Sequence, residues 1–182
     1  CQSSYIISQG WGRVYSQLYG ILSNNYSPST LDSGQTGAFN FKFTSYGLQV
    51  PYPGDASGYW KFVFTLPPCL VNLVNPYVLS INVVDTWNPT SVTTTGNIIT
   101  AIFNGMPPFD LNQAQVKIDL AVDCNGCSGG FGAVDIKVFY VPSVSCSCEV
   151  AVSCQSAPVS ILCATFIIIP VEPELSVCPE GM

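Results

Sequence analysis

The dominant pattern in the chain is an alternation of apolar and polar residues with a period of two, which is typical of half-buried β-strands. Phe39, Phe41 and Phe43 alternate with polar neighbours, and the segment from Trp60 to Leu66 follows the same rule. We therefore predict a strand at each of these two places. Because one face of each strand is apolar and the other polar, each strand is expected to cover a core on one side only.

The alternation continues through the rest of the chain. Residues 70–84 and 97–103 are rich in Val, Leu and Ile, and Asn75-Pro76 predicts a bend or bulge because proline is tolerated only at strand edges and irregularities. Residues 116–122 and 134–140 alternate on either side of a glycine-rich loop, which predicts a β-hairpin. Residues 146–154 alternate again, and residues 159–169 are apolar on both faces, as in a strand between two layers.

Turn-forming sequences recur along the chain, among them Pro67-Pro68 and Pro107-Pro108. Such spacing is typical of a sandwich or jelly roll. We predict an all-β protein with a single antiparallel β-sandwich or jelly-roll-like domain over residues 36–169. Residues 1–22 are expected to form an N-terminal arm, and residues 170–182 a proline-rich C-terminal tail of extended, polyproline-like character.

The N-terminal segment is ambiguous in its spacing. Several apolar residues fit a helix face, although three glycines at positions 10, 12 and 20 weigh against a stable helix. We favour an extended arm that is a candidate donor strand for a neighbouring subunit. The residues expected to carry that contact are Ile7, Trp11, Val14, Leu18 and Leu22.

Charge is scarce in this sequence of 182 residues. Lys and Arg number 5, Asp and Glu number 11, and charged residues make up 9% of the chain, where an ordinary soluble domain carries roughly a quarter. With a net charge of -6 and few basic residues, the chain lacks what is needed to neutralise nucleic-acid phosphates. The absence of histidine excludes Ser-His-Asp and Cys-His catalysis. We expect neither nucleic-acid binding, nor enzymatic activity, nor a cofactor.

The compartment is suggested by hydropathy and by the first residue. The longest apolar stretch, residues 161–171, is too short to span a membrane, so no transmembrane segment is expected. A chain that begins at Cys1 is interpreted as a mature chain whose export signal has been removed. The alternative is a lipidated N-terminal cysteine. Both interpretations give a secreted, extracellular or cell-surface protein.

Nine cysteines point to the same compartment, because oxidising environments preserve disulfides. Because the number of cysteines is odd, one of them cannot form a disulfide within the chain. Cys1 at the terminus is the candidate for this cysteine, through lipidation or a bond to another chain. The disulfide candidates are Cys69, Cys124, Cys127, Cys146, Cys148, Cys154, Cys163 and Cys178. Because positions 124 and 127 share a tight turn, a disulfide between them has suitable geometry and is the interpretation we prefer to a metal site. Eight cysteines allow 105 pairings, and the sequence does not decide among them. The alternative is a zinc or iron-sulfur site formed by Cys124, Cys127, Cys146 and Cys148.

Three other groups of residues could carry chemistry. Asp119, Asp123 and Asp135 could form a calcium or acid/base site, but we expect Asp119 to pair with Lys137 across the predicted hairpin. Most Trp and Tyr residues are expected in the core, while Trp87 and Tyr52 are placed in loops where they could stack on sugars. Asn25 begins an N-glycosylation motif, so surface glycans are expected there.

A surface with so little charge does little to prevent monomers from associating in solution. Open sheet edges also need partners, and an arm from one subunit can complete the sheet of the next. The arm at residues 5–22, the strands from Phe39 to Ile169 and the cysteine excess resemble the all-β subunits of donor-strand extracellular filaments, especially those of thermophilic archaea. That resemblance implies a homo-polymer in which each N-terminal strand fills a groove in the next subunit.

The sequence therefore predicts a structural subunit of a secreted filament or pilus, stabilised by disulfides. Two alternatives remain open. A viral jelly-roll capsid or tail protein would share the edge-rich fold and would form closed shells. A secreted carbohydrate-binding or adhesin module would be a monomer with exposed aromatic side chains.

Overall fold

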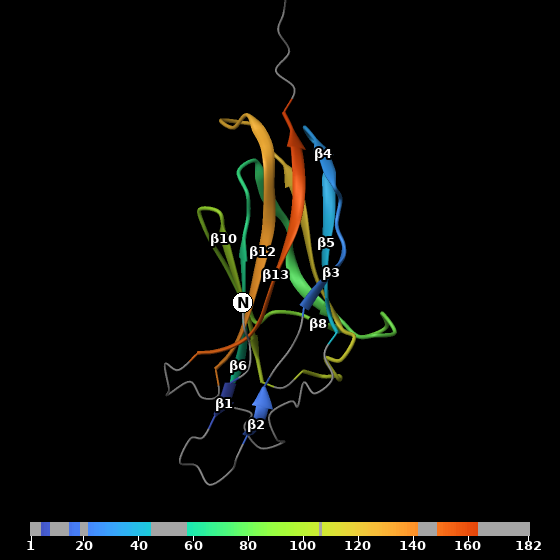
Figure 1. The fold of residues 1–182 in the computed structure, drawn as a ribbon, viewed down its shortest axis with the longest axis vertical. Coiled ribbons are helices and arrows are strands. Elements are labelled where there is room, and N and C mark those ends of the chain that lie inside the picture. Colours follow the sequence, from blue (N-terminus) through green and yellow to red (C-terminus); the bar gives the residue numbers. More distant parts are fainter. Residues whose placement is uncertain are drawn as a thin grey trace, which may run out of the picture.

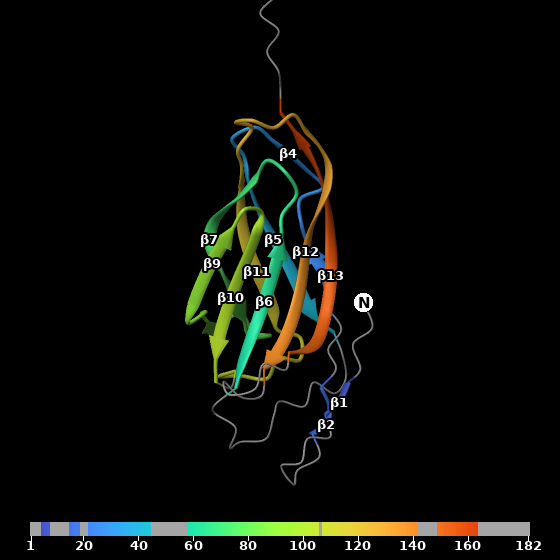
Figure 2. The same ribbon diagram turned by 90° about the vertical axis from the view of Figure 1, so that its left-hand side faces the viewer.

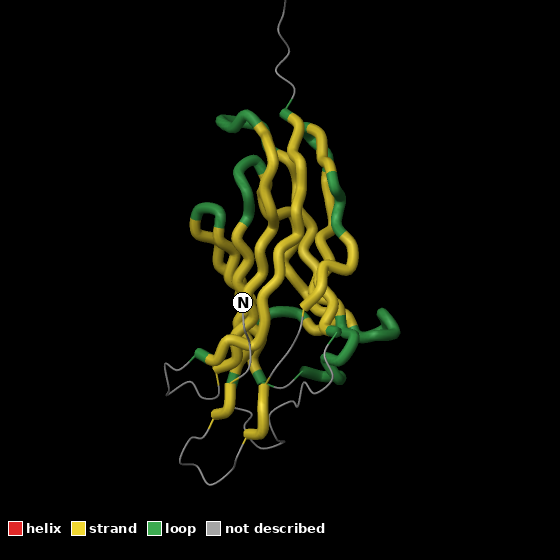
Figure 3. Tube along the Cα trace, viewed as in Figure 1, coloured by secondary structure: helices red, strands yellow, loops and turns green. Residues whose placement is uncertain are grey.

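The computed structural model of this chain describes residues 5–7, 15–18, 22–44, 58–105, 107–141 and 149–163. Every regular element in this part of the chain is a β-strand, as the tube in Figure 3 shows. The predicted all-β sandwich is therefore confirmed. No helix in the described ranges is long and apolar enough to cross a membrane.

Two sheets face each other in Figure 1, with β10, β6, β12 and β13 on the left and β5, β3 and β8 on the right. A six-stranded sheet has the order β4-β13-β12-β6-β10-β9, and a five-stranded sheet has the order β3-β5-β11-β7-β8. Neighbouring strands are antiparallel, except that β4 runs parallel to β13. The strands of the six-stranded sheet are β4 (Thr30–Asp32), β6 (Tyr59–Thr65), β9 (Ser91–Thr95), β10 (Ile98–Asn104), β12 (Gly129–Val141) and β13 (Val150–Leu162).

The five-stranded sheet contains β3 (Leu22–Tyr26), β5 (Thr36–Phe43), β7 (Leu70–Leu79), β8 (Thr86–Trp87) and β11 (Gln115–Val122). Because β3 and β4 already belong to the two sheets, the sandwich begins at Leu22 and not at the expected residue 36. The register of β7 against β11 shifts on both sides of Val74, which places the predicted irregularity next to Asn75-Pro76.

The N-terminal arm is not one extended strand. Its described parts, β1 (Tyr5–Ile7) and β2 (Tyr15–Leu18), pair antiparallel with each other in a separate two-stranded sheet. Figures 1 and 2 both place this pair beyond the lower end of the sandwich. The helical alternative is therefore wrong for these seven residues.

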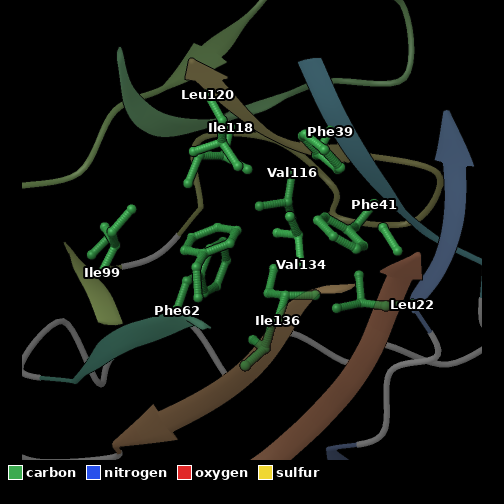
Figure 4. Packing of buried hydrophobic residues seen from close by; sticks show 14 of the residues in the cluster. Leu22, Phe39, Phe41, Phe62, Ile99, Val116, Ile118, Leu120, Val134 and Ile136 are labelled. Carbon is green, nitrogen blue, oxygen red and sulfur yellow. The ribbon is translucent and has the colours of Figure 1, made fainter. Parts of the chain in front are cut away.

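The core lies between the two sheets, and the alternation in the sequence supplies it. Figure 4 shows Phe62, Val134 and Ile136 of the six-stranded sheet pointing toward Phe41 and Val116 of the other sheet, and all five are fully buried. Burying one such side chain contributes roughly 1.5–3 kcal/mol. Because apolar faces from both sheets meet here, the sandwich is held together by sheet-on-sheet packing.

The predicted hairpin between residues 116–122 and 134–140 is wrong. β11 pairs with β5 and β7, whereas β12 pairs with β13 and β6, so the two strands lie in opposite sheets. Their apolar faces meet across the core instead of lying side by side. The loop between Val122 and Gly129 therefore crosses from one sheet to the other.

Candidate functional site

Two disulfides gather at the upper end of the sandwich, where the β6–β7 loop, the β11–β12 loop and the end of β13 meet (Figures 1 and 2). Cys69 pairs with Cys127, and Cys124 pairs with Cys163. The Sγ atoms of Cys69, Cys127 and Cys163 lie within 4.8 Å of one another. Cys154 is also disulfide-bonded. The tip of the molecule is thus covalently tied together from three parts of the chain.

The expected disulfide between Cys124 and Cys127 is wrong, because each of the two binds a different partner. Turn spacing permits the short pairing, but the loop crosses between sheets and brings each cysteine beside another segment. The metal alternative needs thiolates, and in this structure Cys124 and Cys127 are disulfide sulfurs. Its other members, Cys146 and Cys148, lie outside the described residues, as do Cys1 and Cys178.

A groove opens beside these disulfides, and we call it the tip groove. Its volume is about 820 Å³, within the usual range for binding pockets of roughly 300–1,000 Å³. It lies over the start of β12, the end of β13 and the end of β4, and Cys163 forms part of its wall. Six residues that line it and matter for its chemistry are Asp32, Ser33, Ser128, Phe131, Ser160 and Leu162.

Phe131 is the most exposed large apolar side chain among the described residues, with 95% of its surface accessible, and Leu162 is 50% exposed. Phe131 lies opposite Ser160 in the register of β12 with β13. The nearby Gly129 has a φ of +75°, and a Cβ there would meet the backbone oxygen of Ile161 at 2.4 Å. Only glycine fits at that position, so the start of β12 can approach β13 closely.

Phe131 was not among the residues that the sequence singled out, because it lies within the glycine-rich segment that was assigned to a loop. A single aromatic residue flanked by Gly130 and Gly132 was the available signal. Neither glycine has a side chain that could cover the ring.

The aromatic residues predicted to stack on sugars are placed elsewhere. Trp87 is 8% exposed and packs against Phe103 with ring centroids 4.8 Å apart, so it belongs to the core. Trp60 is fully buried beside Tyr140. Tyr52 lies outside the described residues. A sugar platform on Trp87 is therefore excluded.

The three carboxylates are not brought together. Asp119 on β11 and Lys137 on β12 belong to different sheets, so the predicted ion pair between them is wrong. Asp123 accepts a hydrogen bond from the backbone N–H of Asn125, and Asp135 accepts one from the hydroxyl of Ser156. Each of these two carboxylates is engaged locally rather than with the other.

Charge is sparse on the described surface. Lys61 and Glu149 form the one ion pair within the described ranges, and the Lys61 ammonium also lies 5.1 Å from the centre of the Phe139 ring. Asn25, the candidate glycosylation site, is exposed in β3. Of the predicted arm residues, Ile7 lies in β1 and Leu18 in β2, while Trp11 and Val14 fall outside the described residues.

Leu22 differs from the other arm residues because it is part of the sandwich. It is 3% exposed, it begins β3, and its backbone N–H donates to the hydroxyl of Ser153 at 2.9 Å. A truncation that spares the sandwich must therefore stop at residue 21.

No protein-family model matches the sequence, and no curated protein matches it. Solved structures are similar in fold. The N-terminal domain of the Streptococcus gordonii adhesin Sgo0707 is 11% identical with a TM-score of 0.50, over 79% of this chain and 32% of that one. The major pilin GBS80 of Streptococcus agalactiae, as a C-terminal fragment, is 6% identical with a TM-score of 0.50, over 78% of this chain and 55% of that one.

A cohesin module from a Clostridium perfringens family 33 glycoside hydrolase is 10% identical with a TM-score of 0.50, over 80% of this chain and 98% of that one. This chain thus spans about a third to a half of the adhesin and pilin structures and nearly all of the cohesin module. At these identities the likeness shows a shared β-sandwich fold. All three proteins are bacterial, so an archaeal, thermophilic origin stays a prediction.

Proposed function

We propose that this protein is a structural subunit of an extracellular filament, without catalytic activity, which assembles by donating its N-terminal segment to a neighbouring copy. The observation that carries the proposal is the position of β1 and β2. They pair only with each other among the described strands and belong to neither sheet of the sandwich. A segment held this way can move to another subunit without opening the core.

The surface supports self-association over a soluble monomer. Charged residues make up 9% of the chain, and exposed apolar side chains occur on several strands, including Leu73 on β7 and Leu162 on β13. Mixed surface charge is what normally prevents association. The pilin and adhesin among the similar structures agree with a role at a cell surface.

The disulfides support an extracellular location. Five of the nine cysteines are disulfide-bonded within the described residues. Disulfides form and persist chiefly in oxidising compartments. In a filament, they would keep each subunit folded where no chaperone can refold it.

The test is electron microscopy of native, unreduced protein together with a variant that lacks residues 1–21. We expect the full chain to form long filaments and the variant to remain dispersed. The deletion stops before Leu22 because that residue is buried in the sandwich. Circular dichroism and disulfide mapping would show that the variant still folds. Normal filaments from the folded variant would refute N-terminal donation, and closed shells from the full chain would favour a capsid role.

A further inference from the structure

The tip groove has an apolar anchor that the sandwich itself does not use. Phe131 is 95% exposed, and Leu162, which also lines the groove, is 50% exposed. Aromatic side chains of this kind dominate the energetics of protein interfaces. Single exposed apolar residues are common on proteins, but here two of them line one groove together with Ser33, Ser128 and Ser160.

The groove lies where the outermost strand of the six-stranded sheet ends. β4 pairs with β13 on one side only, but at the groove the backbone N–H and C=O of Asp32 are already hydrogen-bonded to Gln35. An occupant of the groove is therefore held chiefly by side-chain contacts and not by main-chain addition to β4.

Charge is sparse in the groove, as it is on the rest of the described surface. Asp32 is its one charged residue, and it forms no ion pair with any residue in the described ranges. The N-terminal segment, residues 1–21, likewise contains one charged residue, Arg13, among aromatic and aliphatic residues. The segment and the groove are therefore complementary both in charge and in apolar character.

The positions of the two features suit an end-to-end contact. β1 and β2 lie at the lower end of the molecule in Figures 1 and 2, while β4 and the tip groove lie at the upper end. A second copy placed above the first along the long axis brings its own β1 and β2 toward this groove. Such a contact joins two different surfaces, so it can repeat indefinitely.

We propose that the tip groove is the acceptor site of the filament and that it binds residues 1–21 of a second copy, with Phe131 as the apolar anchor and Asp32 facing Arg13. This assignment rests on the proposed function. Filaments can exist without it, so the two proposals can fail separately.

The apolar part is tested with the full-length variant Phe131→Ser, whose altered side chain is exposed and contributes nothing to the core. We expect its critical concentration for filament formation to rise roughly tenfold or more, as for an interface anchor. The matched control is Ile98→Ser, which replaces a 41% exposed residue of β10 outside the groove and should assemble normally. Unchanged assembly of Phe131→Ser would overturn the assignment while leaving filament formation itself intact.

The charge contact is tested by exchange of sign. Arg13→Glu places two acidic groups at each junction, and Asp32→Lys places two basic groups there, so each variant alone should assemble poorly. In a mixture of the two variants, the acidic N-terminal segment of the Arg13→Glu variant meets the basic groove of the Asp32→Lys variant. The unaltered segment of the Asp32→Lys variant meets the unaltered groove of the Arg13→Glu variant. We expect alternating copolymers from the mixture and filaments from the double variant.

A merely structural role of either residue would not produce this rescue. If the mixture stays dispersed while each variant folds normally, or if each variant assembles alone like the native chain, the assignment is wrong. A synthetic peptide of residues 1–21 should also inhibit assembly of the native chain. If only a peptide of residues 164–182 inhibits assembly, the C-terminal segment is the occupant of the groove and the assignment is wrong.

Discussion

Removal of the Cys124–Cys163 disulfide should destabilise the protein by about 4 kcal/mol. The two cysteines are 39 residues apart in sequence, and the loop-closure entropy that such a bond removes from the unfolded chain corresponds to about 3.9 kcal/mol at 25 °C. Typical domains are stable by roughly 5–15 kcal/mol. The loss is therefore a large share of the total stability.

The variant should replace both cysteines, as Cys124→Ser with Cys163→Ser. A single substitution at position 124 would leave a thiol at Cys163, whose Sγ lies within 4.8 Å of the sulfurs of Cys69 and Cys127. Thiol–disulfide exchange would then scramble the remaining bond. The double variant keeps the Cys69–Cys127 disulfide and removes only one constraint.

The assay is urea unfolding without reductant, followed by circular dichroism. The matched comparison is Cys69→Ser with Cys127→Ser, which opens a separation of 58 residues and should cost only about 0.3 kcal/mol more, because the dependence on loop length is logarithmic. A loss below about 1 kcal/mol in both variants would refute the reasoning. Cleavage between Asn125 and Gly126 before mass spectrometry would separate Cys124 from Cys127 and show directly that each is bonded elsewhere.

Three further results follow from the packing. Phe62→Ala empties a fully buried position in the core and should lower the free energy of unfolding by about 3–5 kcal/mol in the same urea assay; a loss under about 1 kcal/mol would contradict the core assignment. Gly129→Ala should lower the free energy of unfolding more than Gly126→Ala does. Both glycines have a positive φ, but only a Cβ at position 129 would clash with the backbone oxygen of Ile161 in β13. Equal losses of unfolding free energy in the urea assay would contradict this clash. Glu149→Gln removes the partly exposed ion pair with Lys61 and should change the free energy of unfolding by at most about 1 kcal/mol, so a larger loss would show an additional role.

The alternation in the sequence was sufficient to predict where most strands lie, because burial of one face imposes it directly. It was insufficient to predict which strands pair. β11 and β12 are neighbours in sequence with similar alternation, yet they belong to opposite sheets. An alternating strand reveals which face it buries and not which strand lies beside it. The loop of residues 123–128 is short enough for a hairpin, and the fold instead uses it to cross the core.

Other features were missed for different reasons. β9 contains Val92 among Ser and Thr residues, so it lacks the apolar alternation, although its β-branched composition favours a strand. The tip groove could not be predicted either, because it joins β4, β12 and β13, which are far apart in the sequence. The prediction that Trp87 lies in an exposed loop was wrong. Trp87 belongs to β8, and its ring packs against Phe103.

The polarity of the molecule decides what kind of assembly it can form. A contact that uses the same surface on both partners closes after two copies, whereas a contact between two different surfaces continues to add subunits. Here the tip groove and the N-terminal strands lie at opposite ends of an elongated sandwich (Figure 1). Pairing through the open edge of β9 would instead join two molecules side by side, because β9 is the lateral edge of the six-stranded sheet. The filament that we propose, growing along the long axis, would therefore use the end-to-end contact and not the edge of β9.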